Sequence, residues 1–190
     1  MAKVKMGPLP WVHPTPAFLV GANVDGRPNF MTVAWGGIAN SDPPMISVAL
    51  RHQRYTYKGL RQNMTFSVNI PSLAQAREVD YCGIVSGAKE DKVKACGFKV
   101  FYGKLGTAPL IEQCPVNLEC KVVHILDLGT HAFCIGRIEE IHISEECLTG
   151  GKPDTAKIQP LMYAPAPNQR YYTYGESGGA AFSIGKGITG

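Results

Sequence analysis

The sequence predicts one mainly-β domain over residues 1–190, a β-barrel with short helices. At least six runs are rich in β-branched, aromatic and other apolar residues, and the clearest alternate with the period of two that is typical of strands. Two turn signals, Asp25-Gly26 and Gly129-Thr130, join neighbouring runs as hairpins. No G-x-G-x-x-G sequence joins a strand to a helix, which argues against a Rossmann fold.

The composition is that of an ordinary globular protein. A chain of 190 residues suffices for one core and is short for two domains, and 45% of its residues are hydrophobic and 18% charged. The net charge of +4 is spread without a basic tail, which argues against a nucleic-acid partner. The opening MAKVKMGPLPWVHPTP lacks a signal-peptide core, and nothing later approaches a membrane span. We therefore expect a cytoplasmic protein without a membrane partner.

The first half of the chain alternates strand and turn signals. In chain order these predict a strand at 17–24, the Asp25-Gly26 turn, a strand at 29–35, a glycine hinge at 36–37, a proline turn at 43–44 and a strand at 45–50. Within 29–35, Met31, Val33 and Trp35 alternate with Thr32 and Ala34, so the strand has two unlike faces.

The second half predicts short helices followed by long strands. The elements are a strand at 65–70, a helix at 73–81 capped by Ser72, a glycine turn and short helix within 84–94, a strand at 98–102, and long antiparallel strands at 116–128 and 131–144. The segment 149–170 is rich in glycine and proline and is expected to wrap the surface before a final strand at 171–174.

A basic loop follows the strand at 45–50. Arg51, His52 and Arg54 precede Thr56, which is predicted to cap a short helix that runs through Arg61. Free N–H groups at a helix start, a cap hydroxyl and nearby arginines suit a phosphate. The alternative is a surface loop with an ordinary cap.

Several segments, in order, resemble the flavin reductase-like, FMN-binding split-barrel family. They are RPNFMTVAW, SDPP, SVALRHQRYT, FSVNIP, DYCGIVSGAKEDK, GTHAFCIGRI and the closing YYTYG…FSIGK. The resemblance covers about residues 12 to 186 and implies a split barrel, an FMN cofactor and a homodimer with flavin sites near the subunit interface. FMN is also favoured over FAD because a dinucleotide fingerprint is absent.

The resemblance implies two groups of cofactor-binding residues. Peptide groups and short polar side chains can form hydrogen bonds with the polar atoms of a flavin ring. The residues of the strand at 29–35 that would line the ring are Asn29, Met31, Thr32, Ala34 and Trp35. The phosphate candidates are Arg51, Thr56, Ser86 and Lys92. Local pattern alone would make Trp35 a core residue and Lys92 part of a solvated helix face. Arg54 and Arg61 are assigned to the surface.

His131 begins a predicted strand directly after a Gly-Thr turn. A lone histidine there is usually structural, but the resemblance places a histidine of this GxH pattern near the flavin ring. It would bond the ring or substrate and tune the potential rather than act as an acid or base. For Tyr163, Tyr171 and Tyr172, packing is favoured over covering the flavin or a dimer interface.

The remaining sequence features give no catalytic group and no metal site. Six cysteines without a C-x-x-C pair read as free thiols in a reducing compartment, and the other histidines show no metal spacing. A flavin carries the redox chemistry itself, so catalytic side chains are not required. Three functions stay open: an electron-transfer flavoprotein that serves redox protein partners, an NAD(P)H-dependent flavin or ferric reductase, and a non-catalytic FMN-binding protein.

Overall fold

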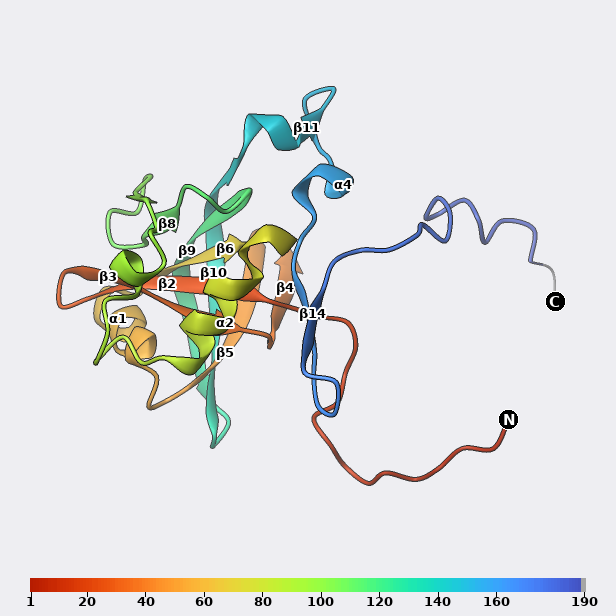
Figure 1. The fold of residues 1–190 in the computed structure, drawn as a ribbon, viewed down its shortest axis with the longest axis horizontal. Coiled ribbons are helices and arrows are strands. Elements are labelled where there is room, and N and C mark those ends of the chain that lie inside the picture. The colour runs from red at the N-terminus through yellow and green to blue at the C-terminus, as the bar shows by residue number, and fades with distance from the viewer. Residues whose placement is uncertain (189–190) are drawn as a thin grey trace.

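The computed structural model describes residues 1–188, and its main feature is one antiparallel sheet of seven strands in the order β3-β2-β6-β9-β10-β5-β4 (Figure 1). The Ala49 N–H of β5 donates to the Trp35 carbonyl just beyond β3 at 2.8 Å, which brings the two sides of the sheet together as a barrel. The seven strands are β2 (Phe18–Val24), β3 (Arg27–Val33), β4 (Gly36–Ser41), β5 (Pro44–Arg51), β6 (Thr65–Ile70), β9 (Val116–Asp127) and β10 (His131–Ile143).

Smaller elements surround this barrel. The short strands are β1 (Thr15–Pro16), β13 (Met162–Ala164) and β14 (Arg170–Tyr172) in one sheet, β7 (Val100–Phe101) with β8 (Leu110–Ile111), and β11 (Leu148–Thr149) with β12 (Lys152–Pro153). The helices are α1 (Tyr55–Asn63), α2 (Ala76–Ile84), α3 (Lys92–Ala95), α4 (Thr155–Ile158) and the 3-10 turns η1 (Leu73–Gln75) and η2 (Glu145–Cys147). No helix within residues 1–188 is long and apolar enough to cross a membrane.

Both predicted hairpins are confirmed. Asp25 and Gly26 join β2 to β3 with φ angles of 51° and 79°, the left-handed pair that a tight hairpin turn needs. β9 and β10 pair along most of their length on either side of Gly129, which has a φ of 84°. The mainly-β prediction therefore holds.

Three local predictions need correction. Residues 36–41 form β4, where only a glycine hinge was predicted, and the turn that follows lies at 42–43, next to the predicted proline turn. A Cβ on Gly36 would lie 2.8 Å from the Ser47 carbonyl, so only glycine pairs there without strain. Arg54 stands at the N-cap of α1 and Thr56 lies in its first turn, so Thr56 is not the cap. The helix predicted at 73–81 divides into η1 and α2 and ends at Ile84.

The core has two parts on opposite faces of β2 and β3. Val20, Met31 and Val33 face the barrel interior, whereas Leu19 and Phe30 pack under α2 and α3. All seven residues of β2 are buried, as expected of a strand covered on both sides. Alternate side chains of β3 therefore point either into the barrel or toward α2 and α3. This difference determines which of them can reach the site described below.

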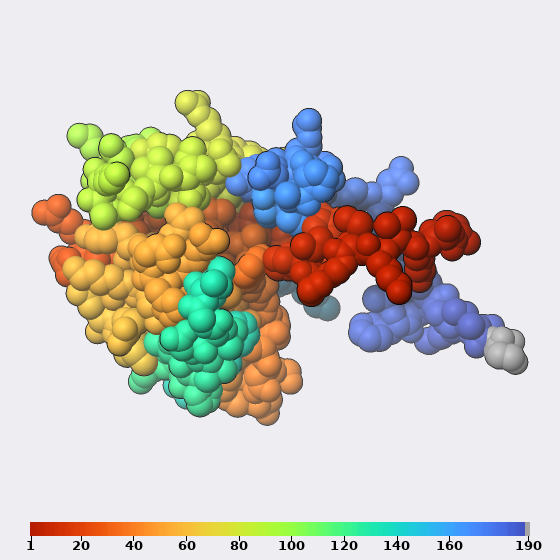
Figure 2. Space-filling view, turned by 90° about the horizontal axis from the view of Figure 1, so that it is seen from below, coloured from red at the N-terminus to blue at the C-terminus, as the bar shows by residue number. Residues whose placement is uncertain are grey.

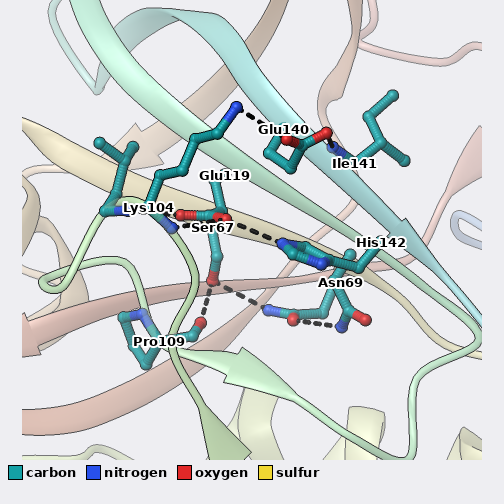
Figure 3. Close-up of polar contacts among 10 residues, drawn as sticks. Ser67, Asn69, Lys104, Pro109, Glu119, Glu140, Ile141 and His142 are labelled. Carbon is teal, nitrogen blue, oxygen red and sulfur yellow. Dashed lines mark hydrogen bonds and ion pairs between the residues drawn. The ribbon is translucent and has the colours of Figure 1, made fainter.

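A buried polar network holds the loop between β7 and β8 against the barrel (Figure 3). The fully buried Glu119 carboxylate accepts from the N–H groups of Lys104 at 3.2 Å and Leu105 at 2.6 Å, and it bonds His142 Nε2 at 2.8 Å. Beside it, the Asn69 side-chain oxygen Oδ1 accepts from the Ile111 N–H at 3.0 Å. The loop is thus fixed by side chains of the sheet rather than by strand pairing alone.

Two arms leave the barrel on the same side. The N-terminal arm, residues 1–14, and the C-terminal arm, residues 173–188, extend away from the body near β14 in Figure 1, and both also project from the body in Figure 2. Nearly every residue of both arms is exposed. The arms contribute little to the core of their own chain.

Candidate functional site

A cavity of about 360 Å³ lies where β3, the end of β5, the start of α1 and the loop after α2 meet. Six of the ten predicted cofactor-binding residues line it. The lining residues are Asn29, Met31, Arg51, Gln53, Arg54, Tyr55, Thr56, Val85, Ser86, Gly87 and Lys92. Segments from four separate parts of the sequence therefore converge on one cavity.

The cavity lining is cationic. Arg51, Arg54 and Lys92 contribute three positive charges, and no Asp or Glu is among the lining residues. Arg54 was assigned to the surface from the sequence; instead it lines the cavity and donates from Nη1 to the Gly83 carbonyl at 3.3 Å. Like charges gathered in a concave, partly dry site favour an anion.

Lys92 is the most constrained of these cations. Its residue is only 3% exposed, and Nζ donates to the carbonyls of Phe30 at 2.9 Å and Cys82 at 2.8 Å. Burial lowers the pKa of its ammonium group, and among the described residues no carboxylate lies within ion-pair distance. The solvated-face alternative is thus wrong, and the ammonium retains one N–H for an anion in the cavity.

The start of α1 adds neutral donors. Asn29 Nδ2 donates to Thr56 Oγ1 at 2.7 Å, so the Thr56 hydroxyl proton remains free to donate elsewhere. No side chain caps α1, and Tyr55 and Thr56 of its first turn line the cavity. Backbone N–H groups, a hydroxyl and three cations together fit a phosphate monoester, which was the group predicted for this position.

Gly87 allows the Asn29–Thr56 pair to form, because a Cβ at Gly87 would lie 1.9 Å from Asn29 Oδ1. We expect Gly87→Ala to displace the Asn29 amide and weaken binding of the predicted cofactor, FMN, by about 10-fold, the cost of roughly one hydrogen bond. Titration of the purified apoprotein with FMN measures this. Gly106→Ala is the matched control, since a Cβ there meets nothing within 4 Å. Equal FMN affinity in both variants would contradict this role for Gly87.

Ala34, Trp35 and His131, three of the residues predicted near the flavin ring, lie beyond this cavity. Trp35 is 46% exposed, so it is not a core residue, and its ring packs against His131 with centroids 4.7 Å apart. Ala34 and Trp35 line a second, mostly apolar cavity of about 360 Å³. His131 lies opposite Arg51 in the β10–β5 register, which joins this pair to the cationic cavity.

The surroundings of His131 favour its neutral form. Partial burial lowers its pKa, and the charge of Arg51 and the neighbouring His52 lower it further. Its Nδ1 lies 2.9 Å from the Thr130 hydroxyl oxygen. A neutral imidazole beside an exposed indole suits hydrogen bonding to a ligand better than proton transfer at neutral pH.

Thr32 is placed differently from its predicted neighbours. Its hydroxyl donates to the Val79 carbonyl of α2, on the face of β3 that is turned away from the barrel interior. Thr32 therefore fastens α2 to the sheet, and its side chain does not line the cationic cavity. Of the ten predicted residues, the cationic cavity gathers Asn29, Met31, Arg51, Thr56, Ser86 and Lys92, and the Trp35 side gathers Ala34, Trp35 and His131.

Comparison with known proteins identifies the fold and the family. The Flavin reductase like domain matches residues 12–172. Flavoredoxin from Methanosarcina acetivorans is 41% identical with a TM-score of 0.94, covering 100% of both chains. Flavoredoxin of Desulfovibrio vulgaris (Miyazaki F) is 40% identical with a TM-score of 0.91, covering 97% of this chain and 100% of the other.

A third structure extends the comparison beyond the flavoredoxins. The FMN-binding protein from Thermus thermophilus, solved with bound p-hydroxybenzaldehyde, is 26% identical with a TM-score of 0.79, covering 95% of this chain and 99% of that one. These matches confirm the predicted split barrel. The chain belongs to the flavin reductase-like family.

Proposed function

We propose that this flavin reductase-like protein binds FMN and transfers electrons as a flavoredoxin-like carrier. The observation that carries the proposal is the cationic cavity with the buried Lys92 ammonium, which has no carboxylate partner among residues 1–188. A phosphate monoester supplies the missing negative charge. The whole-chain similarity to the two flavoredoxins supports the electron-transfer role.

The two ends of the site would bind different parts of the cofactor. Arg51, Lys92 and Thr56 would hold the phosphate in the cationic cavity, and Arg54 would add its charge. Met31, Trp35 and His131 would hold the flavin ring. When bound, FMN supplies the acceptance and donation of electrons. The protein would orient it, and His131, whose pKa is lowered by burial and by the charge of Arg51, would offer the ring a hydrogen bond.

Two alternatives use the same residues. An NAD(P)H-dependent flavin or ferric reductase would bind a nicotinamide against the exposed side of the ring, and a non-catalytic FMN-binding protein would only retain the cofactor. We prefer the carrier because the sequence has no recognisable nicotinamide motif. For its partners we propose a redox protein and a second copy of this chain. We place the protein in the cytoplasm, where six free cysteines persist.

A visible spectrum of the purified protein, with NADH and then NADPH added anaerobically, tests these functions. For the carrier we expect a yellow protein whose flavin neither nucleotide bleaches within minutes, but which a reduced ferredoxin- or cytochrome-like protein bleaches. Bleaching by a nicotinamide within seconds would identify the reductase. If no donor reduces the flavin, the non-catalytic FMN-binding function remains. A colourless protein that fails to bind added FMN would refute all three functions.

A further inference from the structure

The C-terminal end of α2 binds the two least exposed cations of the cationic cavity. Lys92 Nζ donates to the Cys82 carbonyl at 2.8 Å. Arg54 Nη1, at the start of α1, donates to the Gly83 carbonyl at 3.3 Å. Both carbonyls belong to the last turn of α2, where the helix itself offers them no N–H partner. The open end of this helix is therefore occupied by cations of the proposed phosphate site.

This contact supplies negative charge without a carboxylate. Aligned peptide dipoles place roughly half a negative charge at the C-terminal end of a helix. Burial lowers the pKa of the Lys92 ammonium, and the charge of Arg54 lowers it further, so the two cations need compensation. Within residues 1–188 neither cation pairs with an Asp or Glu. A carboxylate would compete with a phosphate for these donors, whereas the helix end holds both cations and still lets them attract an anion.

Thr32 fixes this end of α2 to the sheet. Its hydroxyl donates to the Val79 carbonyl, and a Cβ on Gly83 would lie 3.4 Å from the Thr32 Cβ. Val79 and Gly83 are four residues apart and so lie on the same side of the helix. Thr32 thus contacts the turn whose carbonyls hold the cations. Two residues earlier on β3, the Phe30 carbonyl accepts from Lys92 Nζ at 2.9 Å, so the strand contacts both the helix end and one of its cations.

We propose that Thr32 is a positioning residue for the cations that bind the flavin phosphate, and that it acts through α2. Thr32 does not line the cationic cavity, so its effect there must pass through the helix end that it fastens. A charge-assisted hydrogen bond weakens when its donor shifts or turns away from the acceptor. The end of α2 must therefore be fixed for Lys92 and Arg54 to meet one phosphate group together.

This role differs from contact with the flavin ring, which the resemblance implied for Thr32. The hydroxyl is turned toward α2, and the part of the cofactor that it would affect is the phosphate. The inference rests on the proposed function in taking FMN as the ligand. It adds to the phosphate site a residue that does not touch the ligand, and it explains how the cations are held without an acidic side chain.

The test compares two flavins on the apoprotein of the full chain. Thr32→Val removes the hydroxyl and keeps a β-branched side chain, and the Val79 carbonyl keeps its partner within α2, so the variant should fold. We expect FMN binding to weaken by about 10-fold and the binding of riboflavin, which lacks the phosphate, to change by less than about 2-fold. Thr32→Ser, which retains a hydroxyl, should keep most of the FMN affinity. Fluorescence titration with each flavin measures both affinities.

Thr65→Val is the matched control. Thr65 Oγ1 and Thr107 Oγ1 share a hydrogen bond at 2.6 Å, and Thr65 lines neither the cationic cavity nor the cavity beside Trp35. This variant also loses one threonine hydrogen bond, but one that holds neither α2 nor a cation. We expect it to bind both flavins as the parent chain does. Urea denaturation of each variant shows whether a loss of binding follows from a loss of folding.

Inorganic phosphate tests the same contact without a flavin. We expect sodium phosphate, compared with sodium chloride at equal ionic strength, to raise the Tm of the parent and Thr65→Val apoproteins, and Thr32→Val to lose most of this increase. The general effect of phosphate on protein hydration is common to all variants and cancels in the comparison.

Three results would overturn the inference. They are an unchanged FMN affinity in Thr32→Val, an equal loss for both flavins, which would indicate contact with the ring, and a loss that Thr32→Ser shares. A parent chain that binds no FMN would refute the proposed function instead. The inorganic phosphate comparison would then decide on the role of Thr32, because an increase in Tm that Thr32→Val retains in full would contradict it.

Discussion

Lys92→Met is expected to weaken FMN binding by about 100-fold and to leave the binding of riboflavin, which lacks the phosphate, almost unchanged. Methionine preserves the apolar stem of the side chain and removes the ammonium group that faces the cationic cavity. Fluorescence titration of apoprotein with each flavin measures both affinities. The ratio of the two isolates the phosphate contact from any general disturbance of the ring site.

The matched control for this experiment is Lys89→Met. Lys89 lines a neighbouring cavity of about 380 Å³ that also touches Lys92, but its side chain is exposed. Removing a screened surface charge should change FMN affinity little. If Lys92→Met kept the parent affinity for FMN, or lost affinity for both flavins equally, the assignment of the phosphate to this cavity would be wrong.

The hairpins were predictable because their signals are local. Asp25-Gly26 forms the β2–β3 turn with two residues in the left-handed conformation. The two strands that pair across this turn are next to each other in the sequence. The same holds for β9 and β10 around Gly129. β4 was missed because Gly36 and Gly37 indicate a hinge locally, whereas the close approach to β5 that Gly36 permits is a property of the assembled sheet.

The cofactor cavity was predictable only in part. The resemblance supplied Lys92, but its burial depends on α3 folding back against β3 and α2, which no local pattern reveals. Arg54 was missed for the same reason, since its position at the N-cap of α1 was assigned to Thr56. Thr32 alternates in sequence with Met31 and was grouped with it, although the tertiary packing places α2 against the Thr32 side. Periodicity separates the faces of a strand but does not say what covers each face.

Glu119→Leu is expected to lower the free energy of unfolding by about 3–5 kcal/mol while leaving FMN affinity unchanged. The carboxylate is fully buried and is the acceptor for the Lys104 and Leu105 N–H groups and the partner of His142 Nε2 (Figure 3). Leucine has similar bulk but no acceptor, so these donors would lose their bonds. Urea denaturation of the apoprotein measures the loss.

The control for Glu119→Leu is Glu140→Gln on the neighbouring strand β10. Glu140 forms an exposed ion pair with Lys104 at 2.8 Å, and an exposed pair of this kind contributes little to stability. None of the residues that bond Glu119 lines the cationic cavity, so the network and the flavin site are separate. Glu119→Leu should then lower the free energy of unfolding, whereas Lys92→Met should weaken binding of the phosphate. An unfolding free energy for Glu119→Leu as high as that for Glu140→Gln would show that the loop is held by its apolar contacts instead.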